Sequence, residues 1–216
     1  MWQTSLLLTA SLSVGGSPLI GVLALQGDVR EHRKMLESLG ANVVEIRTPE
    51  HLSGIQGLVL PGGESSVMDK LTRLFGLRDP LIELIGQGIP VLGTCAGMIM
   101  VADDIEDAIE GQLSLGGLDV TVRRNAFGSQ KDSFDVSLSV DEYGPDPVDV
   151  SFIRAPAVTR VGDGVRALAM LDAGRVVAVA NETITALAFH PEVTGETRFH
   201  QRFIGQAQAW SSPTSA

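Results

Sequence analysis

The stretch Ile89-Pro90-Val91-Leu92-Gly93-Thr94-Cys95-Ala96-Gly97-Met98 decides how the chain is expected to fold. A short apolar run leads into Gly-x-Cys-x-Gly, and residues 96–101 then have the pattern of a helix. This strand, turn and helix form the nucleophile-elbow pattern, with sulfur in place of a hydroxyl. The glycines are needed because side chains beside the cysteine would clash with the neighbouring strand and helix. The pattern predicts Cys95 above the sheet edge, at a helix N-terminus that favours the thiolate.

Two interpretations of this cysteine remain open on this segment alone. It is the only cysteine of the chain, which excludes an intrachain disulfide and an all-cysteine metal cluster. A lone cysteine is most often a buried structural residue. In the catalytic interpretation, Cys95 attacks a carbonyl carbon, and the N–H of Ala96 points toward the oxyanion that forms.

A histidine that could act with this sulfur follows a second apolar run, at residues 184–189. His190 comes directly after that predicted strand, where a parallel sheet places its functional residues. Pro191 forces a turn, and Glu192 lies two residues beyond His190, so both side chains can face the same way. The carboxylate would then bond one ring nitrogen and leave the other for Cys95. The alternative is an ordinary strand-ending turn. We expect no catalytic role for the remaining histidines, which are His32, His51 and His200.

Outward from these motifs, the first half of the chain alternates strands and helices. Apolar runs predict strands at 20–25, 43–46, 57–60 and 89–92, separated by helices at 29–39, 65–74 and 80–87. Asp28 is expected to cap the first of these helices.

The second half is mostly strand-like, at 118–122, 134–140, 165–171, 175–180 and 184–189, with a hairpin turn at 172–174 and a closing helix at 196–210. The acidic residues 103–107 are expected to form a solvated face or loop. The predicted fold is α/β, with a mostly parallel central sheet flanked by helices and antiparallel additions in the C-terminal half.

Composition and length limit what the chain can be. Its 216 residues suit a single domain, and we find no linker and no internal repeat. With 16 Lys and Arg against 26 Asp and Glu, the net charge of −10 disfavours sequence-independent binding of nucleic acid. No apolar run reaches the roughly 18 residues of a membrane span, so we expect a cytoplasmic protein.

The ends of the chain have the composition of disordered segments. We expect a leader over residues 1–18, a folded domain over 19–210 and a tail over 211–216. A weak signal peptide is the alternative for the leader, but no basic residue precedes its apolar part.

Three motifs together resemble a known family. Gly-Thr-Cys-Ala-Gly-Met at 93–98, Phe-His-Pro-Glu at 189–192 and Leu-Pro-Gly-Gly-Glu-Ser at 60–65 look like those of class I, triad-type glutamine amidotransferases. Over roughly residues 20–205 the chain more narrowly resembles the glutaminase subunits of pyridoxal 5′-phosphate synthase. The segments that carry this narrower resemblance are 21–32, 124–130 with 132–134, and 152–156. The resemblance implies the flavodoxin-like fold of class I glutamine amidotransferases.

The resemblance also implies a role for each matching residue. Cys95 would be the nucleophile, His190 the general acid and base, and Glu192 the residue that orients it. The N–H groups of Gly63 and Ala96 would form the oxyanion hole. An arginine suits the α-carboxylate of an amino acid, and a carboxylate suits its α-ammonium. Glutamine would accordingly be held by Gly63, Glu64, Ser65, Arg124, Ile153 and Arg154.

The implied reaction is hydrolysis of L-glutamine to L-glutamate and ammonia through a Cys95 thioester, with no metal or organic cofactor. The resemblance implies a partner in a hetero-oligomer, a barrel-type synthase subunit that builds pyridoxal 5′-phosphate with this ammonia. It further implies a glutaminase that is nearly silent until it docks. We expect docking to act at Gln26-Gly27, at the end of the first strand and near the oxyanion hole.

Three other functions compete with this one. A glutaminase serving a histidine or purine pathway is disfavoured by the Arg-Asn-x-Phe-Gly segment at 124–128. A glutamine-sensing binding subunit would not need the intact set of Cys95, His190 and Glu192. A cysteine peptidase is the weakest, because the glycine loop and Arg124 suit a free amino acid better than a chain.

Overall fold

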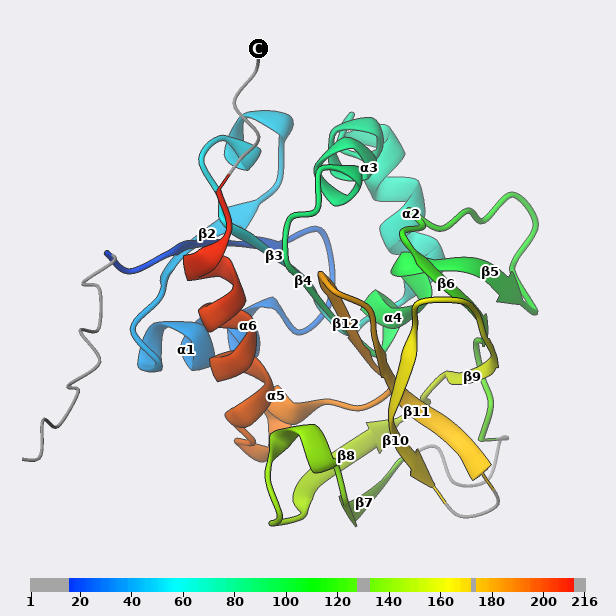
Figure 1. Ribbon diagram of the computed structural model, residues 1–216. Helices are drawn as coiled ribbons and strands as arrows, with labels where there is room; N and C mark the ends of the chain where they lie inside the picture. The colour runs from blue at the N-terminus through cyan, green and yellow to red at the C-terminus, as the bar shows by residue number, and fades with distance from the viewer. Residues whose placement is uncertain (1–15, 128–132, 172–173, 212–216) are drawn as a thin grey trace, which may run out of the picture.

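A ten-stranded sheet forms the centre of the protein, whose computed structural model describes residues 16–127, 133–171 and 174–211 (Figure 1). Its strands are β1 (Leu19–Leu23), β2 (Asn42–Ile46), β3 (Gly57–Leu60), β4 (Val91–Thr94), β5 (Ala102–Glu106), β6 (Leu118–Arg123), β9 (Ala157–Val161), β10 (Arg166–Leu171), β11 (Arg175–Ala180) and β12 (Ile184–Leu187). Their order is β2-β1-β3-β4-β12-β11-β9-β6-β5, with β10 paired to β11. A second sheet is the hairpin of β7 (Ser133–Leu138) and β8 (Val148–Ile153).

The parallel half of the sheet lies between β2 and β12. β1 pairs in parallel with β2 and β3, and β4 pairs in parallel with β3 and β12. Every residue of β3, β4 and β12 is buried, as in strands that are covered on both faces. Antiparallel pairs of β11 with β12, β11 with β9 and β9 with β6 continue the sheet toward its other edge. The predicted fold class is therefore confirmed.

Helices cover both faces of this sheet. They are α1 (Val29–Ser38), α2 (Ser65–Leu74), α3 (Arg78–Gly86), α4 (Ala96–Val101), α5 (Pro191–Thr194) and α6 (Arg198–Ala209), with the short 3-10 helices η1 (Pro49–Leu52) and η2 (Asp141–Tyr143). On one face, α1 packs on β1 and β2, and α6 packs on β3 and β4. On the other face, α4 packs on β3, β4 and β12 and supports α2, which contacts α3 (Figure 1). No helix in the described ranges is long and apolar enough to cross a membrane.

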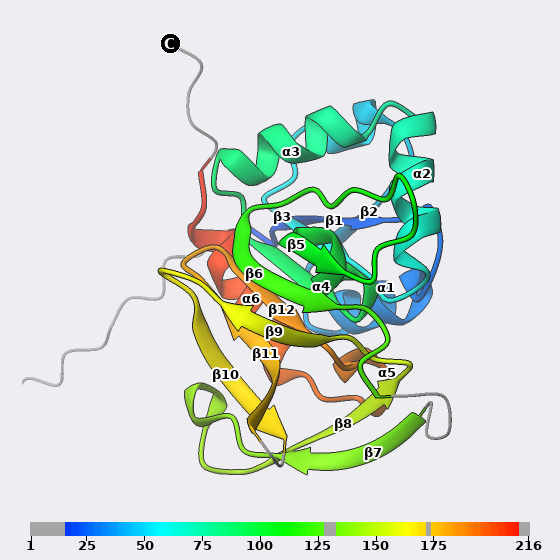
Figure 2. The same cartoon turned by 90° about the vertical axis from the view of Figure 1, so that its right-hand side faces the viewer.

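A column of aromatic rings joins the β7–β8 hairpin to the rest of the protein. The hairpin lies at the opposite end of the molecule from α3 (Figure 2). Phe152 of β8 stacks on Phe134 of β7 with ring centroids 4.8 Å apart, and its edge meets Phe189 at 5.5 Å. Phe189 in turn meets Phe199 of α6 at 5.5 Å. Each such pair adds about 0.5–1.5 kcal/mol beyond its burial, so the column fixes β8 beside the segment that follows β12.

Several elements differ from the sequence-based expectation. The acidic residues 103–107, expected as a solvated face or loop, are largely exposed but lie mostly in a strand, β5, at an edge of the sheet and parallel to β6. Glu106 of β5 pairs with Arg123 of β6 at 2.7 Å, and charged side chains are the usual protection of an edge strand. Their composition therefore resembled that of a loop. β8 and β9 were not predicted, and the helix α5 begins where only a turn was expected.

Some predictions concern residues outside the described ranges. They are the leader up to residue 15, residues 128–130 and 132 of one resemblance segment, residues 172–173 of the hairpin turn, and the tail from residue 212. The strands on either side of that turn, β10 and β11, are antiparallel, as a hairpin requires. The boundaries of the folded domain, 19–210, stay a prediction.

Candidate active site

Cys95 lies in the turn between β4 and α4, with a backbone conformation that non-glycine residues rarely adopt. Its φ is 47° and its ψ is −102°, and its N–H donates to the carbonyl of Leu187 in β12 at 2.7 Å. A Cβ on Gly93 would stand 2.8 Å from the carbonyl of Gly97, and one on Gly97 would stand 2.0 Å from the carbonyl oxygen of Leu60. Both glycines are therefore required sterically, and the turn holds Cys95 in a strained position.

His190 follows β12 and is held in place through its backbone and its ring. Its N–H donates to the carbonyl of Ser151 in β8 at 3.0 Å, so the aromatic column also fixes this histidine. Its Nδ1 lies 2.8 Å from Oε1 of Glu192, as the two-residue spacing predicted. A Cβ on Gly62 would stand 2.3 Å from Cε1 of His190, so only glycine leaves room for the ring.

Asp28 stands at the N-cap of α1, as expected, but its side chain pairs with His190 instead of capping the helix. The side chain of Asp28 makes no cap hydrogen bond, and its Oδ2 lies 3.3 Å from Nδ1 of His190. The hydrogen bond to His190 lowers the pKa of Asp28, although partial burial opposes this shift. The signal that could have identified Asp28 is its place shortly after β1, at the carboxyl end of a parallel strand.

The surroundings of His190 favour its charged form. Burial disfavours the imidazolium, but hydrogen bonds to Asp28, to the Cys95 thiol and to Glu192 outweigh it and raise the pKa of His190 well above its ordinary value. A cationic ring beside a thiol stabilises the thiolate, which is the nucleophilic form of cysteine. The arrangement thus supplies a nucleophile and a proton donor side by side.

The same three groups are close enough to hold a metal ion in principle. Ligand atoms of Asp28, His190 and Glu192 all lie within 4.8 Å of one another. Both carboxylates, however, approach the same ring nitrogen, Nδ1, at 3.3 and 2.8 Å. A proton on Nδ1 gives both carboxylates a donor, so an imidazolium between two carboxylates accounts for the geometry.

A cavity of about 250 Å³ opens beside Cys95 and His190. It is smaller than the roughly 300–1,000 Å³ of sites for drug-sized ligands, and it suits a molecule the size of an amino acid. Its lining residues are Gln26, Gly27, Asp28, Gly63, Glu64, Ser65, Cys95, Ile99, Arg124, Asn125, Ile153, Arg154 and His190. The structure therefore brings together every residue that the sequence analysis named for glutamine.

Two residues named by the sequence analysis do not line this cavity. Glu192 is buried behind His190, and Ala96 is the first residue of α4, directly after Cys95. Gln26, Ile99 and Asn125 line it without having been predicted as substrate contacts. Gln26 was placed near the oxyanion hole only as a docking point, and Asn125 lies in a segment of the resemblance, but an amide or aliphatic side chain by itself does not indicate a substrate contact.

An ion pair occupies one side of the cavity. Nη2 of Arg124 lies 2.7 Å from Oε1 of Glu64, and the arginine is almost completely buried. Within the described residues, Nε of Arg124 is buried without a hydrogen-bond partner. Arg124 also lines the cavity, so its guanidinium group is placed to pair with a carboxylate of a ligand. The loop of Glu64 is fixed in turn by Gln26, whose Oε1 accepts from the N–H of Glu64 at 2.7 Å.

Backbone strain is concentrated at this cavity. In the described part of the chain, three non-glycine residues have positive φ, and two of them, Cys95 and Arg154, line it. The carbonyl of Ile153, next to Arg154, accepts from the Cys95 thiol at 3.8 Å. Strained residues of this kind persist where the surrounding structure holds them, commonly at functional sites.

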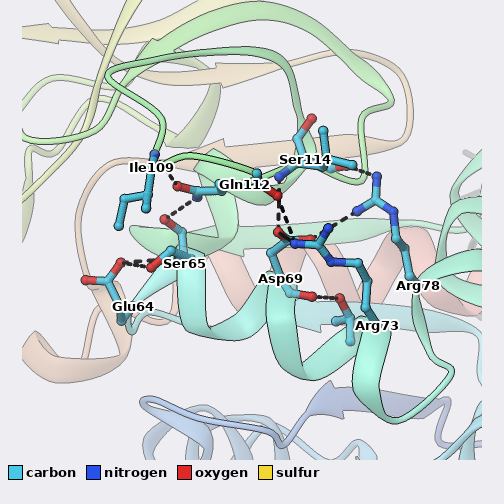
Figure 3. A network of polar contacts seen from close by, with 12 residues as sticks. Glu64, Ser65, Asp69, Arg73, Arg78, Ile109, Gln112 and Ser114 are labelled. Atoms are coloured by element: carbon cyan, nitrogen blue, oxygen red, sulfur yellow. Dashed lines mark hydrogen bonds and ion pairs between the residues drawn. The ribbon is translucent and has the colours of Figure 1, made fainter.

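Ser65, at the start of α2, is held from behind by a loop that the sequence analysis left unassigned (Figure 3). Nε2 of Gln112 donates to Oγ of Ser65 at 3.0 Å, while Oε1 of Gln112 accepts from the N–H of Ile109 at 3.3 Å. The loop around Gln112 thus supports the wall of the cavity.

Asp69, one turn further along α2, anchors the same loop (Figure 3). It is buried and accepts from the N–H of Leu113 at 3.1 Å. Its carboxylate also pairs with Arg73 and Arg78, and these arginines donate to the carbonyls of Gly111 and Ser114 in the loop. The buried charge is therefore matched from several sides, as buried charges generally are.

A cysteine on a strained elbow, a histidine held between carboxylates and a small polar cavity define a class, that of cysteine-dependent amide hydrolases on an α/β sheet. Comparison with known proteins specifies the family. The family model of the SNO glutamine amidotransferase family matches residues 22–209, and the chain belongs to this family. The predicted resemblance is thereby confirmed.

Known relatives agree with this assignment. "Pyridoxal 5′-phosphate synthase subunit PdxT" of Clavibacter sepedonicus is 58% identical over 194 residues, covering 90% of this chain and 93% of the relative. The protein of the same name from Leifsonia xyli subsp. xyli is 56% identical over 191 residues, covering 88% and 96%. A solved structure, "Crystal structure of glutamine amidotransferase", is 42% identical with a TM-score of 0.81, covering 87% of this chain and 98% of that one.

Proposed function

We propose that the chain hydrolyses L-glutamine to L-glutamate and ammonia, and that residues 19–210 carry this activity. The observation that supports it most strongly is that Cys95 meets the distant pair of His190 and Glu192 beside a cavity of amino-acid size. Membership in a glutamine amidotransferase family names the same substrate.

The reaction begins when the Cys95 thiolate attacks the carbon of the glutamine side-chain amide. The N–H groups of Gly63 and Ala96 donate to the oxyanion that develops. His190 gives its proton to the amide nitrogen, the C–N bond breaks, and ammonia leaves a thioester on Cys95. His190 then takes a proton from a water molecule, which attacks the thioester and releases glutamate. Glu192 keeps the ring of His190 oriented and compensates its charge in both steps.

The charged groups of glutamine match the ion pair in the cavity. The α-carboxylate binds to the guanidinium group of Arg124 and the α-ammonium binds to Glu64, because both side chains belong to residues that line the cavity. Ser65, Ile153 and Arg154 complete the walls. A cysteine peptidase would need an open groove for a chain, so the small cavity disfavours that alternative.

The ammonia serves the synthesis of pyridoxal 5′-phosphate with a synthase partner. Relatives at 56–58% identity bear the name of a pyridoxal 5′-phosphate synthase subunit, which supports this assignment. The partner is a barrel-type subunit that receives the ammonia directly, and docking acts on Gln26 and Gly27. Gln26 is suited to transmit docking, because it bonds the loop of Glu64 and lines the cavity.

The test compares the chain and its Cys95→Ala variant, each with and without a synthase subunit. We expect glutamine-dependent formation of pyridoxal 5′-phosphate only with the unmodified chain and the synthase together. The variant should lose turnover while still binding glutamine in calorimetry. If the variant retained more than a few per cent of the ammonia release, the role of Cys95 would be refuted. Equal glutaminase rates with and without the synthase would refute activation by docking.

A further inference from the structure

Close to Glu192 lies a pair of histidines that the mechanism above does not use. His32 of α1 and His200 of α6 are both fully buried, with ring centroids 5.1 Å apart. Nδ1 of His32 lies 2.9 Å from Nε2 of His200. Neither histidine lines the cavity, and α1, which carries His32, packs on both α5 and α6.

The other nitrogen of His32 faces the catalytic groups. Nε2 of His32 lies 3.0 Å from Oγ1 of Thr94, the residue before Cys95, and 3.4 Å from Oε1 of Glu192. That same oxygen, Oε1, is the one that approaches Nδ1 of His190 at 2.8 Å. Two imidazole rings thus face one carboxylate oxygen of Glu192.

Both rings of the pair are neutral, because burial lowers the pKa of His200 to about 4 and that of His32 well below its ordinary value. Each neutral ring carries a single N–H proton, and only one of these two protons lies in the hydrogen bond between the rings. That shared proton is bonded either to Nδ1 of His32 or to Nε2 of His200. The contacts around the pair distinguish the two arrangements.

If Nδ1 of His32 carried the proton, two costs would follow. His200 would carry its own proton on Nδ1, which is buried and has no hydrogen-bond partner in the described part of the protein. A buried N–H without an acceptor is rare and costly. The bare Nε2 lone pair of His32 would also face the carboxylate oxygen of Glu192 at 3.4 Å.

The opposite arrangement avoids both costs. His200 donates from Nε2 to Nδ1 of His32 and leaves only a lone pair at its buried Nδ1. His32 then carries its proton on Nε2, where it donates to Thr94 and presents a positive hydrogen to Glu192. An N–H that faces a carboxylate stabilises its charged form.

We propose that His32 is a positioning residue, which holds the carboxyl group of Glu192 in line with His190, and that His200 fixes the tautomer of His32. This inference rests on the proposed glutaminase function for its catalytic consequence. The tautomers themselves can be tested without any activity.

The first test is a long-range ¹H–¹⁵N correlation spectrum of the full chain with ¹⁵N-labelled histidine at pH 7. We expect both His32 and His200 to be neutral, with the proton on Nε2. A proton on Nδ1 of His32, or a charged His32, would overturn the proposal. Because the unmodified protein is used, the result stands whether or not substituted chains fold.

The second test measures kcat and KM for glutamine in the complex with the synthase subunit. Loss of a hydrogen-bond donor facing a charged group predicts a kcat about 10- to 100-fold lower for His32→Leu, with KM changed less than about twofold. His32→Gln keeps a side-chain N–H that can face Thr94 and Glu192, and should recover most of the rate. His51→Gln, at an exposed histidine of η1, is the control and should not change either constant.

The outcomes separate this inference from the proposed function. An unchanged kcat in His32→Leu, or equal losses in the Leu and Gln variants, would show that His32 only fills space and would overturn the proposal. If the unmodified complex released no ammonia from glutamine, the proposed function would fail. The NMR spectrum would still show whether Nε2 of His32 carries the proton that faces Glu192.

Discussion

At the scale of single residues, the site depends on a few side chains whose positions are fixed by the backbone and by close packing. Cys95 is held at positive φ, and a side chain at Gly62 would collide with the ring of His190. Arg124 is buried, with one nitrogen on Glu64 and another without a partner. Arg124 is therefore already in place before an amino acid binds, which lowers the entropic cost of binding.

Replacing Arg124 by lysine tests whether this arginine binds the α-carboxylate of glutamine. Lysine keeps the charge but lacks the fork of donors, so it cannot serve Glu64 and the α-carboxylate together. Loss of a charged hydrogen bond predicts a KM for glutamine about 10- to 100-fold higher, with a smaller change in kcat. Steady-state ammonia release measures both constants. An unchanged KM would exclude Arg124 from substrate binding, and Arg123→Lys, at an exposed arginine of β6, is the matched control.

At the scale of elements, the elbow between β4 and α4 requires that α4 pack closely against β3. The Cβ of an alanine at Gly97 would stand 2.0 Å from the carbonyl oxygen of Leu60, so backbone must move. We expect Gly97→Ala to lower the free energy of unfolding by at least about 2 kcal/mol.

Gly205→Ala in α6 is the matched control for Gly97→Ala, because a Cβ there meets nothing within 4 Å. It should raise the free energy of unfolding by about 0.5–1 kcal/mol through its better helix propensity. Urea unfolding measures both variants. Equal effects of the two alanines would contradict the steric account of the elbow.

A second element-scale prediction concerns Asp69, which ties α2 to the loop around Gln112 (Figure 3). An amide at this position presents donors to two arginines and to a backbone N–H, so we expect Asp69→Asn to lower the free energy of unfolding by about 1.5–3 kcal/mol. Asp79→Asn, on the exposed side of α3, should change it by less than about 0.5 kcal/mol. A loss no larger than that of the control would mean that the network does not stabilise the fold.

The elements also show which parts of the site a sequence can predict. The elbow at Cys95 and the pair of His190 and Glu192 were predictable, because each is encoded by residues close together in the chain. The place of Asp28 after β1 indicated the correct edge of the sheet, but its pairing with His190 was not predictable, and neither was the support of His190 by β8, because both depend on which strands become neighbours. β8 and β9 were missed, and β5 resembled a loop because an edge strand carries charges.

At the scale of the whole molecule, the buried His32 and His200 should make the fold sensitive to mild acid. A base whose pKa is lowered by folding binds a proton in the unfolded chain first, so stability falls as pH drops from about 6.5 toward 4. His190, whose pKa is raised, acts in the opposite direction as pH falls toward 6.5, and so does Glu192, whose pKa burial raises, so the two offset part of this loss.

The two buried histidines should outweigh His190 between pH 7 and pH 5.5. We expect a net loss of about 1–2 kcal/mol in the free energy of unfolding over this interval, as measured by urea titration at each pH. A free energy that stayed constant or rose on acidification would show that these rings are not buried in their neutral form.

The whole account rests on Cys95 as a nucleophile activated by His190, and one labelling experiment tests this most directly. The complex with the synthase is treated with a glutamine-analogue electrophile, and intact mass and peptide mapping locate the adduct. We expect one adduct per chain, on Cys95, formed more slowly in excess glutamine and at least about 100-fold more slowly in His190→Asn. Because the chain has a single cysteine, the assignment is unambiguous. Ammonia release from glutamine without any adduct on Cys95 would contradict the account.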